Sequence, residues 1–279
     1  MNDVILKAEN IHYSYDSEKE ALKGVSLDIH EKERLVILGA NGSGKSTFFL
    51  NINGVLKPES GEVYYKDKLI DKSGIKELRK NVGIVFQDAD NQIIASSVRA
   101  EVSFGPMNLG LSKEEVKKRV DDALNYMNIH HLIDRPPHYL SGGEKKRVSI
   151  ADIIAMDSKI IIFDEPTASL DPKNVAIFED ALDKMSSDGK TLVISTHDIE
   201  FAYRFADRIV VFCDGNIIAD GKSVDVLSDD KVLKMANLKK PILLDVFDTL
   251  VENSIITKDC VPVRSVEEFR DLIISQAKA

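Results

Sequence analysis

The sequence lacks the features that would tie the chain directly to a membrane or to a disulfide or zinc framework. Only two of its 279 residues are cysteine, Cys213 and Cys260, and they form no CxxC pair. This argues against a disulfide or zinc scaffold and favours a reducing cytosol. No apolar run approaches the ~20 residues of a membrane span, and residues 1–5 show no charged-then-apolar signal pattern. We therefore expect a soluble chain that, if it works at a membrane, is held there by another protein.

The sequence also has no excess of basic residues. The chain has 37 Lys and Arg against 46 Asp and Glu, a net charge of −9 and a pI near 5.3. A nucleic-acid binder needs a basic face, and an acidic surface gives no reason to expect adsorption to anionic lipid. The rest of the composition, with 43% hydrophobic and 30% charged residues, is that of an ordinary globular protein with enough apolar side chains for a buried core.

One stretch of the chain has the pattern of a phosphate-binding loop. Residues 39–46 read GANGSGKS and fit G-x-x-x-x-G-K-[ST] at every fixed position, between an apolar run and a helical pattern. The glycines let successive N–H groups face an anion, Lys45 would reach the β- and γ-phosphates, and Ser46 would ligate Mg²⁺. A dinucleotide-binding loop is excluded because its third glycine is missing. The predicted nucleotide-binding residues of this stretch are Gly39, Ala40, Asn41, Gly42, Ser43, Gly44, Lys45, Ser46 and Thr47.

Two carboxylates end an apolar run further along the chain. The run Ile160–Phe163 is followed by Asp164, Glu165 and Pro166. At the carboxyl edge of a parallel sheet, both carboxylates would face the crevice where the phosphate-binding loop lies. In isolation, an acidic turn closed by a proline would explain these residues equally well. Their position after a complete phosphate-binding loop favours the nucleotide role.

Apolar strand patterns alternate with helical patterns over most of the chain, which predicts an α/β fold with a parallel sheet and crossover helices. The predicted strands of this part are 35–38, 84–86, 160–163 and 191–195, and the predicted helices are 45–53, 112–128, 144–156 and 175–186. The second helix is expected to begin with a capping box formed by Ser112 and Glu115. Residues 4–8 and 24–29 alternate like half-buried strands and predict an N-terminal antiparallel portion. After about residue 223 the pattern changes to short segments.

A third motif, Leu140–Glu144 with the sequence LSGGE, lies between the loop and the acidic strand. The three motifs in this order resemble the ABC-type ATPases, and the resemblance covers about residues 1–225, the expected ATPase domain. It implies a P-loop NTPase fold with a RecA-like parallel core, an N-terminal antiparallel portion and a helical subdomain at about 88–156 that carries the signature. It also implies that the chain binds ATP with Mg²⁺ and hydrolyses it. Residues 226–279 would then be a short C-terminal extension, whose apolar clusters predict a role in dimerisation.

The resemblance assigns roles to single residues of the nucleotide site. Glu165 would act as the general base toward the attacking water. Gln87, as the Q-loop residue, and His197, as the switch histidine at the γ-phosphate, would complete the catalytic set. Ser46, Gln87 and Asp164 would hold the Mg²⁺ that accompanies ATP. A single Gln or His after a strand is weak evidence by itself, and its place in this order of motifs gives it the role.

The signature residues would not serve the nucleotide that Lys45 holds. The resemblance implies that they contact the γ-phosphate bound by a second copy of the domain, in a head-to-tail dimer with ATP between the subunits. These residues are Leu140, Ser141, Gly142, Gly143 and Glu144. Ser169, Leu170 and Asp171 match the D-loop that crosses the same interface, although Asp171 followed by proline is also an ordinary turn signal.

An aromatic ring upstream of the phosphate-binding loop is expected, by the same resemblance, to stack on adenine. Tyr15 and Tyr13 are the two candidates. Tyr15 is favoured because it stands at the start of the polar loop 16–20.

Three further segments, 86–92, 104–110 and 134–140, look closely like those of energy-coupling-factor ATPases, in particular the subunits for cobalt or nickel import. The short separation of Lys45 from Ser141 leaves no room for the long coiled coil of DNA-repair relatives. The resemblance implies a homodimer or a heterodimer with a paralogue, peripheral at the cytoplasmic face of the membrane. An integral membrane coupling subunit and a substrate-binding membrane subunit would be its partners, without nucleic acid. Uptake of a vitamin such as biotin or riboflavin, or of another coupling-factor cargo, stays open, as does a soluble ABC switch without transport.

Overall fold

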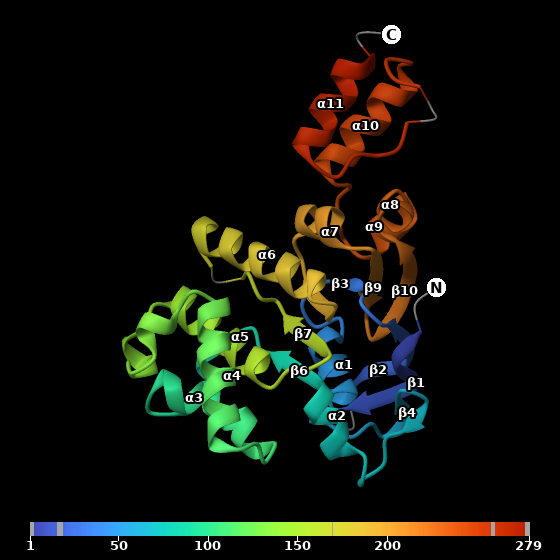
Figure 1. Cartoon of the computed structure of the whole chain (residues 1–279). Helices are drawn as coiled ribbons and strands as arrows, with labels where there is room; N and C mark the ends of the chain where they lie inside the picture. Colours follow the sequence, from blue (N-terminus) through green and yellow to red (C-terminus); the bar gives the residue numbers. More distant parts are fainter. Residues whose placement is uncertain (1–2, 16–18, 169, 258–259, 277–279) are drawn as a thin grey trace.

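The computed structural model describes residues 3–15, 19–168, 170–257 and 260–276, and in these ranges the strands form two sheets (Figure 1). The antiparallel sheet has the order β2-β1-β4-β5, with strands Val4–Ser14 (β1), Glu20–His30 (β2), Ser60–Tyr65 (β4) and Lys68–Leu69 (β5). The second sheet has the order β10-β9-β3-β8-β7-β6, with strands Arg34–Leu38 (β3), Val82–Val85 (β6), Ile160–Asp164 (β7), Thr191–Thr196 (β8), Arg208–Cys213 (β9) and Asn216–Lys222 (β10). The predicted α/β fold with an N-terminal antiparallel portion is confirmed.

The second sheet is parallel from β9 to β6, and its edge strand β10 is antiparallel. Every residue of β6, β7 and β8 is buried. Parallel strands covered on both faces need apolar side chains on both, which explains the nearly continuous apolar sequences of these three strands. Parallel strands end at one edge of a sheet, so the segments that follow β3, β6, β7 and β8 meet there. These segments carry the phosphate-binding loop, Gln87, Glu165 and His197.

Helices cover both faces of the parallel sheet. They are Lys45–Ile52 (α1), Ile75–Asn81 (α2), Val98–Asn108 (α3), Lys113–Tyr126 (α4), Gly142–Ala155 (α5), Pro172–Ser187 (α6) and Ile199–Phe205 (α7). One buried apolar cluster joins α3 to α7 to one face of the sheet, and a second joins α1 and the antiparallel sheet to the other face. In Figure 1, α3, α4 and α5 lie together as a lobe beside the sheets. This helical lobe carries the LSGGE segment at the start of α5.

Two helix starts show how the local sequence shapes the helical lobe. At α4, the Ser112 side chain accepts a hydrogen bond from the Glu115 N–H, as predicted, but the Glu115 carboxylate pairs with Arg119 at 2.9 Å. The predicted capping box is therefore formed on one side only. A complete box occurs at α5, where Ser141 and Glu144 cap each other. It fixes the geometry of the helix start that carries the signature.

Beyond β10 the chain continues as Ser223–Leu227 (α8), Asp230–Met235 (α9), Ile242–Glu252 (α10) and Val266–Gln276 (α11). α8 and α9 pack on the apolar core beside the parallel sheet through Val226 and Leu233, and α10 is attached by the fully buried Leu244. Tyr203 donates a hydrogen bond to the Val263 carbonyl at 2.8 Å, which ties the segment before α11 to α7. α10 and α11 project from the rest of the chain (Figure 1). The predicted domain boundary after residue 225 falls within α8.

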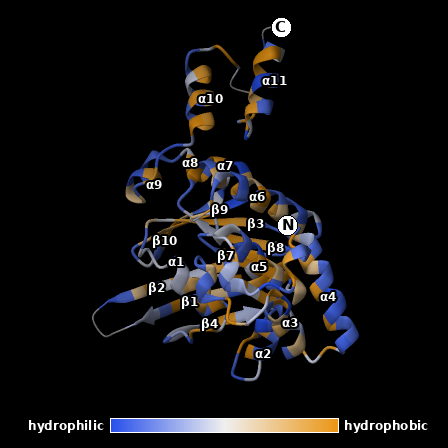
Figure 2. Ribbon diagram, turned by 90° about the vertical axis from the view of Figure 1, so that its left-hand side faces the viewer, coloured by the Kyte–Doolittle hydropathy of each residue, from blue (hydrophilic) through white to orange (hydrophobic). Residues whose placement is uncertain are grey.

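Both projecting helices and the segment between them expose large apolar residues, and stretches of both helices are coloured orange, for hydrophobic, in Figure 2. The exposed residues are Ile242, Val246, Ile255, Val261, Val266, Ile273 and Ile274. A group of exposed apolar side chains marks a surface that contacts another molecule. Within the described ranges, no helix combines the length and the apolar character needed to cross a bilayer.

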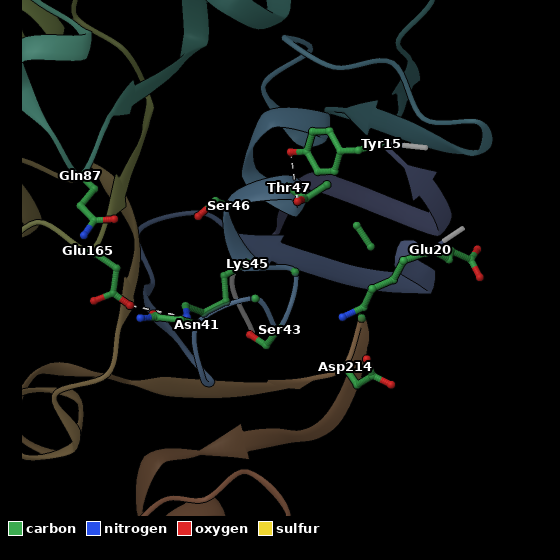
Figure 3. A pocket seen from close by; sticks show the side chains of 15 residues that line it. Tyr15, Glu20, Asn41, Ser43, Lys45, Ser46, Thr47, Gln87, Glu165 and Asp214 are labelled. Atoms are coloured by element: carbon green, nitrogen blue, oxygen red, sulfur yellow. Dashed lines mark hydrogen bonds and ion pairs between the residues drawn. The ribbon is translucent and has the colours of Figure 1, made fainter. Parts of the chain in front are cut away.

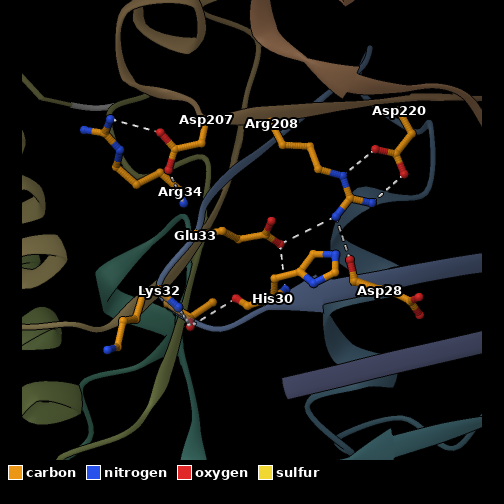
Figure 4. A network of polar contacts seen from close by, with 9 residues as sticks. Asp28, His30, Lys32, Glu33, Arg34, Asp207, Arg208 and Asp220 are labelled. Atoms are coloured by element: carbon orange, nitrogen blue, oxygen red, sulfur yellow. Dashed lines mark hydrogen bonds and ion pairs between the residues drawn. The ribbon is translucent and has the colours of Figure 1, made fainter. Parts of the chain in front are cut away.

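A polar network ties the two sheets together at the edge opposite the nucleotide loops (Figure 4). Arg208, the first residue of β9, donates to both carboxylate oxygens of Asp220 and, at 2.8 Å, to the carbonyl of Asp28. Its Nη1 also lies 3.6 Å from Oε1 of Glu33. Glu33 is buried and accepts a hydrogen bond from the His30 N–H, yet burial raises the pKa of its carboxyl. Arg208 is therefore the cation that offsets the cost of burying the Glu33 carboxylate between the two sheets.

Replacing Arg208 with methionine should lower the free energy of unfolding by about 2 kcal/mol, because it leaves two carboxylates without their cation. The shift in the urea midpoint measures the loss. The matched control is Lys7→Met, which removes an ion pair with Glu9 whose two side chains are each 42% exposed and should move the midpoint little. Equal losses in the two variants would show that the Arg208 network contributes no more than a surface pair.

Candidate nucleotide-binding site

The phosphate-binding loop turns between β3 and α1, and two close backbone approaches require its glycines. Gly39 has φ +151°, and a Cβ on it would lie 2.4 Å from the carbonyl oxygen of Phe212. Gly44, the residue before α1, has φ +109°, and its Cβ would lie 2.7 Å from the carbonyl oxygen of Ala21. Among the described residues α1 has no side-chain cap at this end, so its first N–H groups are open to an anion.

Lys45 holds a positive charge inside the loop. Its side chain is 4% exposed, and its Nζ donates to the carbonyl oxygens of Gly39 at 2.7 Å and Ala40 at 3.3 Å. The same Nζ lies 3.5 Å from Oε1 of Glu165. A buried ammonium beside open helix N–H groups attracts an anion such as a phosphate.

A pocket of about 490 Å³ opens in front of the loop (Figure 3). Its lining includes the predicted residues Tyr15, Asn41, Gly42, Ser43, Gly44, Lys45, Ser46, Thr47, Gln87 and Glu165, and also Lys19, Glu20, Ala21, Asp214 and Gly215, which the sequence did not single out. Two buried polar atoms of these residues, Ser43 Oγ and Glu165 Oε1, have no hydrogen-bond partner in the described part of the chain. Glu165 Oε1 is in an ion pair with Lys45 at 3.5 Å. Buried polar atoms are nearly always paired, so the Ser43 hydroxyl is the atom that indicates a ligand here. The volume is in the range of small-molecule sites.

Ser195, which the sequence did not single out, holds the carboxylate of Asp164 and the main chain of Glu165 in place. β7 and β8 pair in parallel with Asp164 opposite Ser195. The fully buried Ser195 Oγ donates to Oδ1 of Asp164 at 2.6 Å and accepts from the N–H of Glu165 at 2.9 Å. A serine near the end of an apolar strand is the only sequence signal for this role. The hydrogen-bond partners of Ser195 depend on the strand register, which cannot be predicted from the sequence.

Glu165 lies between Lys45 and His197. Its Oε2 is 2.9 Å from Nδ1 of His197, whose side chain is 68% exposed, and its Oε1 faces Lys45. Glu165 is 7% exposed and has φ +43°, a conformation that is unfavourable for a residue with a Cβ. Backbone strain of this kind persists where surrounding contacts hold it, and it is common at functional sites. The structure thus brings three of the predicted residues together.

Gln87 and Ser46 add oxygen ligands to the pocket. In Figure 3, Gln87 and Glu165 lie on one side of the pocket and Tyr15 on the other, with the loop between them. Gln87 follows β6 and is exposed, as is Ser46 in the first turn of α1. Hydroxyl, amide and carboxylate oxygens are the donors that Mg²⁺ prefers. The chemistry of the predicted set Ser46, Gln87 and Asp164 suits a Mg²⁺ ion bound with a nucleotide, and the first two line the pocket. Asp164 is buried behind them, is bonded to Ser195, and is not among the described lining residues.

Of the two candidate tyrosines, Tyr15 lines the pocket and Tyr13 does not. The Tyr15 ring is 64% exposed, and its hydroxyl lies 3.3 Å from Oγ1 of Thr47. Tyr13 meets Tyr15 edge-on, with ring centroids 5.1 Å apart, and packs against the core below the antiparallel sheet. An exposed ring supported by a second ring can stack on a base. Tyr15 remains the predicted adenine contact.

The signature segment lies outside this pocket. None of Leu140–Glu144 is among its described lining residues. Ser141 is exposed, and both its hydroxyl and its N–H donate to Glu144 Oε2 at 2.8 Å, which lowers the pKa of the Glu144 carboxyl. A Cβ on Gly143 would lie 2.5 Å from the side chain of Asn174 in α6, so a larger residue here would displace the Asn174 side chain. The role of the segment toward a second subunit stays a prediction.

The predicted D-loop is described only in part, because Ser169 lies outside the described residues. Leu170 lines a small hollow of about 70 Å³ together with Gly142. The Asp171 side chain caps α6 by accepting a hydrogen bond from the Asn174 N–H at 2.9 Å. Asp171 is thus a turn and cap residue, and its place at a dimer interface stays a prediction.

Comparisons with known proteins agree with this geometry. A family model described as ABC transporter matches residues 22–168. The energy-coupling factor transporter ATP-binding protein EcfA of Methanocaldococcus jannaschii is 40% identical over 98% of both chains. The structure of cbiO1 from Clostridium perfringens, described as part of the ABC transporter complex cbiONQ, is 43% identical over 88% of this chain and 100% of its own, with a TM-score of 0.74. An ATP-binding cassette solved as a dimer in a post-hydrolysis state with ADP and Pi is 34% identical over 78% of this chain and 99% of its own, with a TM-score of 0.71.

Changing Glu165 to glutamine should leave ATP binding intact, since Lys45, Ser46 and the loop N–H groups are unchanged. Hydrolysis should fall by about 100- to 10,000-fold, because the side chain can no longer take a proton from water. Phosphate release measures the rate, and a fluorescent ATP analogue measures the affinity. The variant should also accumulate as an ATP-bound dimer in size-exclusion chromatography.

The matched control is Glu114→Gln, the same change at an exposed residue of α4, which should keep wild-type turnover. Ordinary turnover in Glu165→Gln would remove Glu165 from the role of general base.

Proposed function

The chain belongs to the ABC transporter family, and we propose that it is the ATP-hydrolysing subunit of an energy-coupling-factor importer for cobalt or nickel ions. Hydrolysis of ATP is the activity of this family, and the energy-coupling-factor type is that of the EcfA relative that matches 98% of the chain. The observation that carries the function is that Lys45 and Glu165 line the pocket in front of the phosphate-binding loop, with Glu165 in contact with both Lys45 and His197.

In the proposed reaction, the loop N–H groups and Lys45 bind the phosphates of ATP. Mg²⁺ held by Ser46, Gln87 and Asp164 would neutralise charge on the phosphate oxygens. Glu165 takes a proton from the attacking water, and its carboxylate is oriented by the 2.9 Å contact with His197. Because Glu165 is 7% exposed, few bulk water molecules can compete with the one that attacks.

The second contact to the γ-phosphate is proposed to come from a partner subunit. Ser141 and Gly142 are exposed at the start of α5 and do not line the described part of this chain's own pocket. An exposed helix N-terminus with a glycine can approach a phosphate closely. The 34% identical cassette was solved as a dimer. We propose that the chain works as a homodimer or as a heterodimer with a paralogous ATPase.

The helical lobe offers a surface for a membrane subunit. Ile94, Phe104 and Met107 are exposed large apolar residues on or just before α3, and apolar side chains gathered at a surface favour docking. The relative cbiO1 is part of the complex cbiONQ. We propose peripheral attachment to the cytoplasmic face of the membrane through an integral coupling subunit, with a separate membrane subunit that binds the substrate.

The metal cargo is proposed from the segments 86–92, 104–110 and 134–140, which are similar to those of cobalt or nickel import ATPases. In the structure they form the turn after β6, the end of α3 and the segment before α5. All three therefore lie in or beside the helical lobe, where the membrane subunit would dock. They support a membrane partner of the cobalt or nickel type, and through that partner the proposed cargo.

Transport is tested in cells that lack this gene. Radioactive cobalt or nickel uptake should return with the wild-type chain and not with Glu165→Gln, and the tagged chain should bring a polytopic subunit out of solubilised membranes. Restored uptake of biotin or riboflavin without metal uptake would contradict the metal cargo and leave the ATPase role intact. A chain recovered only from the soluble fraction would contradict the membrane assembly.

Residues after Pro241 are proposed to stabilise the ATPase dimer through the exposed apolar side chains of α10 and α11. Their deletion should weaken the nucleotide-free dimer and lower specific activity at dilute protein, with recovery at high concentration by mass action. A dilution series measures this dependence. Because Leu244 is buried in the core, the full-length variants Ile242→Glu and Ile274→Glu repeat the test without removing a core residue.

The control for these surface changes is Leu69→Glu, at an exposed apolar residue of β5, which should keep the wild-type dilution curve. A loss of activity that is the same at every protein concentration would show that the tail acts on folding or catalysis instead.

A further inference from the structure

Lys146 is a buried lysine that the reaction described above does not use. It lies on α5, just after the LSGGE segment, and is 4% exposed. Its Nζ donates to the main-chain carbonyl oxygens of Phe86 at 2.6 Å and Gln87 at 2.9 Å. In the described part of the chain this ammonium has no close ion pair, and the carboxylates of Asp164 and Asp88 act on it from a greater distance. Lys146 therefore bonds the main chain of the turn that carries Gln87 to the signature helix.

Other contacts hold the same turn against α5. Lys145 Nζ lies 2.6 Å from Oδ1 of Asp90. The Gln92 side chain accepts from the Phe86 N–H at 3.2 Å and donates to the Ser149 carbonyl at 3.1 Å. Although the turn continues from β6 in sequence, its side-chain and main-chain groups are bonded to α5.

An ammonium in this position is unfavourable for folding. Burial lowers the pKa of Lys146 to about 8, although Asp164 and Asp88 act in the opposite direction. An apolar side chain of similar length would fill the space without placing a charge there. A buried cation that is bonded to the carbonyls of a site turn is explained better by function than by stability.

We propose that Lys146 is a positioning residue for ATP hydrolysis: it fixes the main chain at Phe86 and Gln87, and thereby the direction in which the Gln87 side chain enters the nucleotide pocket. The inference rests on the proposed role of Gln87 as a Mg²⁺ ligand. Gln87 lines the pocket together with Ser46 and Glu165, and its own carbonyl is bound by Lys146. Because a side chain turns with its peptide plane, loss of these contacts would let the Gln87 amide leave the metal site.

The same contact joins two functional segments. Gln87 serves the nucleotide of its own subunit, whereas Ser141, at the start of α5, is proposed to serve the nucleotide of the partner. Lys146 follows Ser141 on the same helix, so a displacement of this helix start reaches Gln87 through one side chain. The Mg²⁺ site of one subunit would thus depend on the position of the partner subunit.

The test compares full-length Lys146→Met with the wild-type protein, because methionine keeps a similar length and volume but donates no hydrogen bond. We expect the Mg²⁺ concentration that gives the half-maximal effect on binding of a fluorescent ATP analogue to rise about tenfold, while binding in EDTA changes less than about twofold. The kcat should fall about tenfold, with a smaller change in KM. A purely structural lysine would change stability and leave the Mg²⁺ dependence as in the wild type.

A double-mutant cycle tests whether Lys146 acts through Gln87. Gln87→Ala should slow hydrolysis, and adding Lys146→Met to it should change the rate by less than about twofold. Independent, multiplying losses would mean that Lys146 acts elsewhere, and they would overturn the proposal.

The matched control is Lys118→Met, the same change at an exposed lysine of α4; it should keep the wild-type Mg²⁺ dependence. If Lys146→Met does not fold, Lys146→Gln replaces it, because the shorter amide cannot reach both carbonyls and should give the same shift. If Lys146→Met keeps the wild-type Mg²⁺ dependence and hydrolysis rate while Glu165→Gln hydrolyses ATP slowly, this inference is refuted and the proposed function is not. Rapid turnover of Glu165→Gln refutes the proposed site itself.

Discussion

The parallel pairing of β7 with β8, in which Asp164 stands opposite Ser195, determines the geometry of the nucleotide site. It places both carboxylates, the serine hydroxyl and, one residue beyond β8, His197 at the same edge of the sheet. β3 pairs with the other side of β8 and brings the phosphate-binding loop to that edge. A slip of one residue would turn every side chain of a strand to the other face, and Ser195 would lose both partners. Because these strands are buried on both faces, their packing fixes the register and with it the chemistry.

Residues that lie in one stretch of chain could be predicted from the sequence, and residues joined only by tertiary contacts could not. The phosphate-binding loop is a run of consecutive residues whose spacing predicts its function. The role of Glu165 is predicted from its place in the order of motifs. Ser195 and Lys146 have no such local signal. The role of Ser195 depends on strand register, and that of Lys146 depends on how α5 packs against the turn after β6.

The same division applies to the fold. The predicted strand 160–163 and helix 144–156 correspond to β7 and α5, because a continuous apolar run and a helical repeat are strong local signals. α3 was not predicted, because it contains Gly105 and Pro106, which are unfavourable inside a helix. Its packing explains the glycine: a Cβ at position 105 would lie 2.4 Å from a side-chain atom of Met156. Tertiary contact with α5 therefore overrides the weak helical preference of this segment.

Two buried ammonium groups, Lys45 and Lys146, stand near the carboxylates at and just after the end of β7, and both donate to main-chain carbonyls. A neutral carbonyl is a weaker partner for an ammonium than a carboxylate or a phosphate. Lys45 is only partly neutralised within the site, by Oε1 of Glu165 at 3.5 Å, and burial of both ammonium groups is costly in stability. The whole chain has a net charge of −9, so its overall field repels a nucleotide. Attraction of ATP must come from these local groups and from the open start of α1, which is why the loop geometry, rather than surface charge, determines binding.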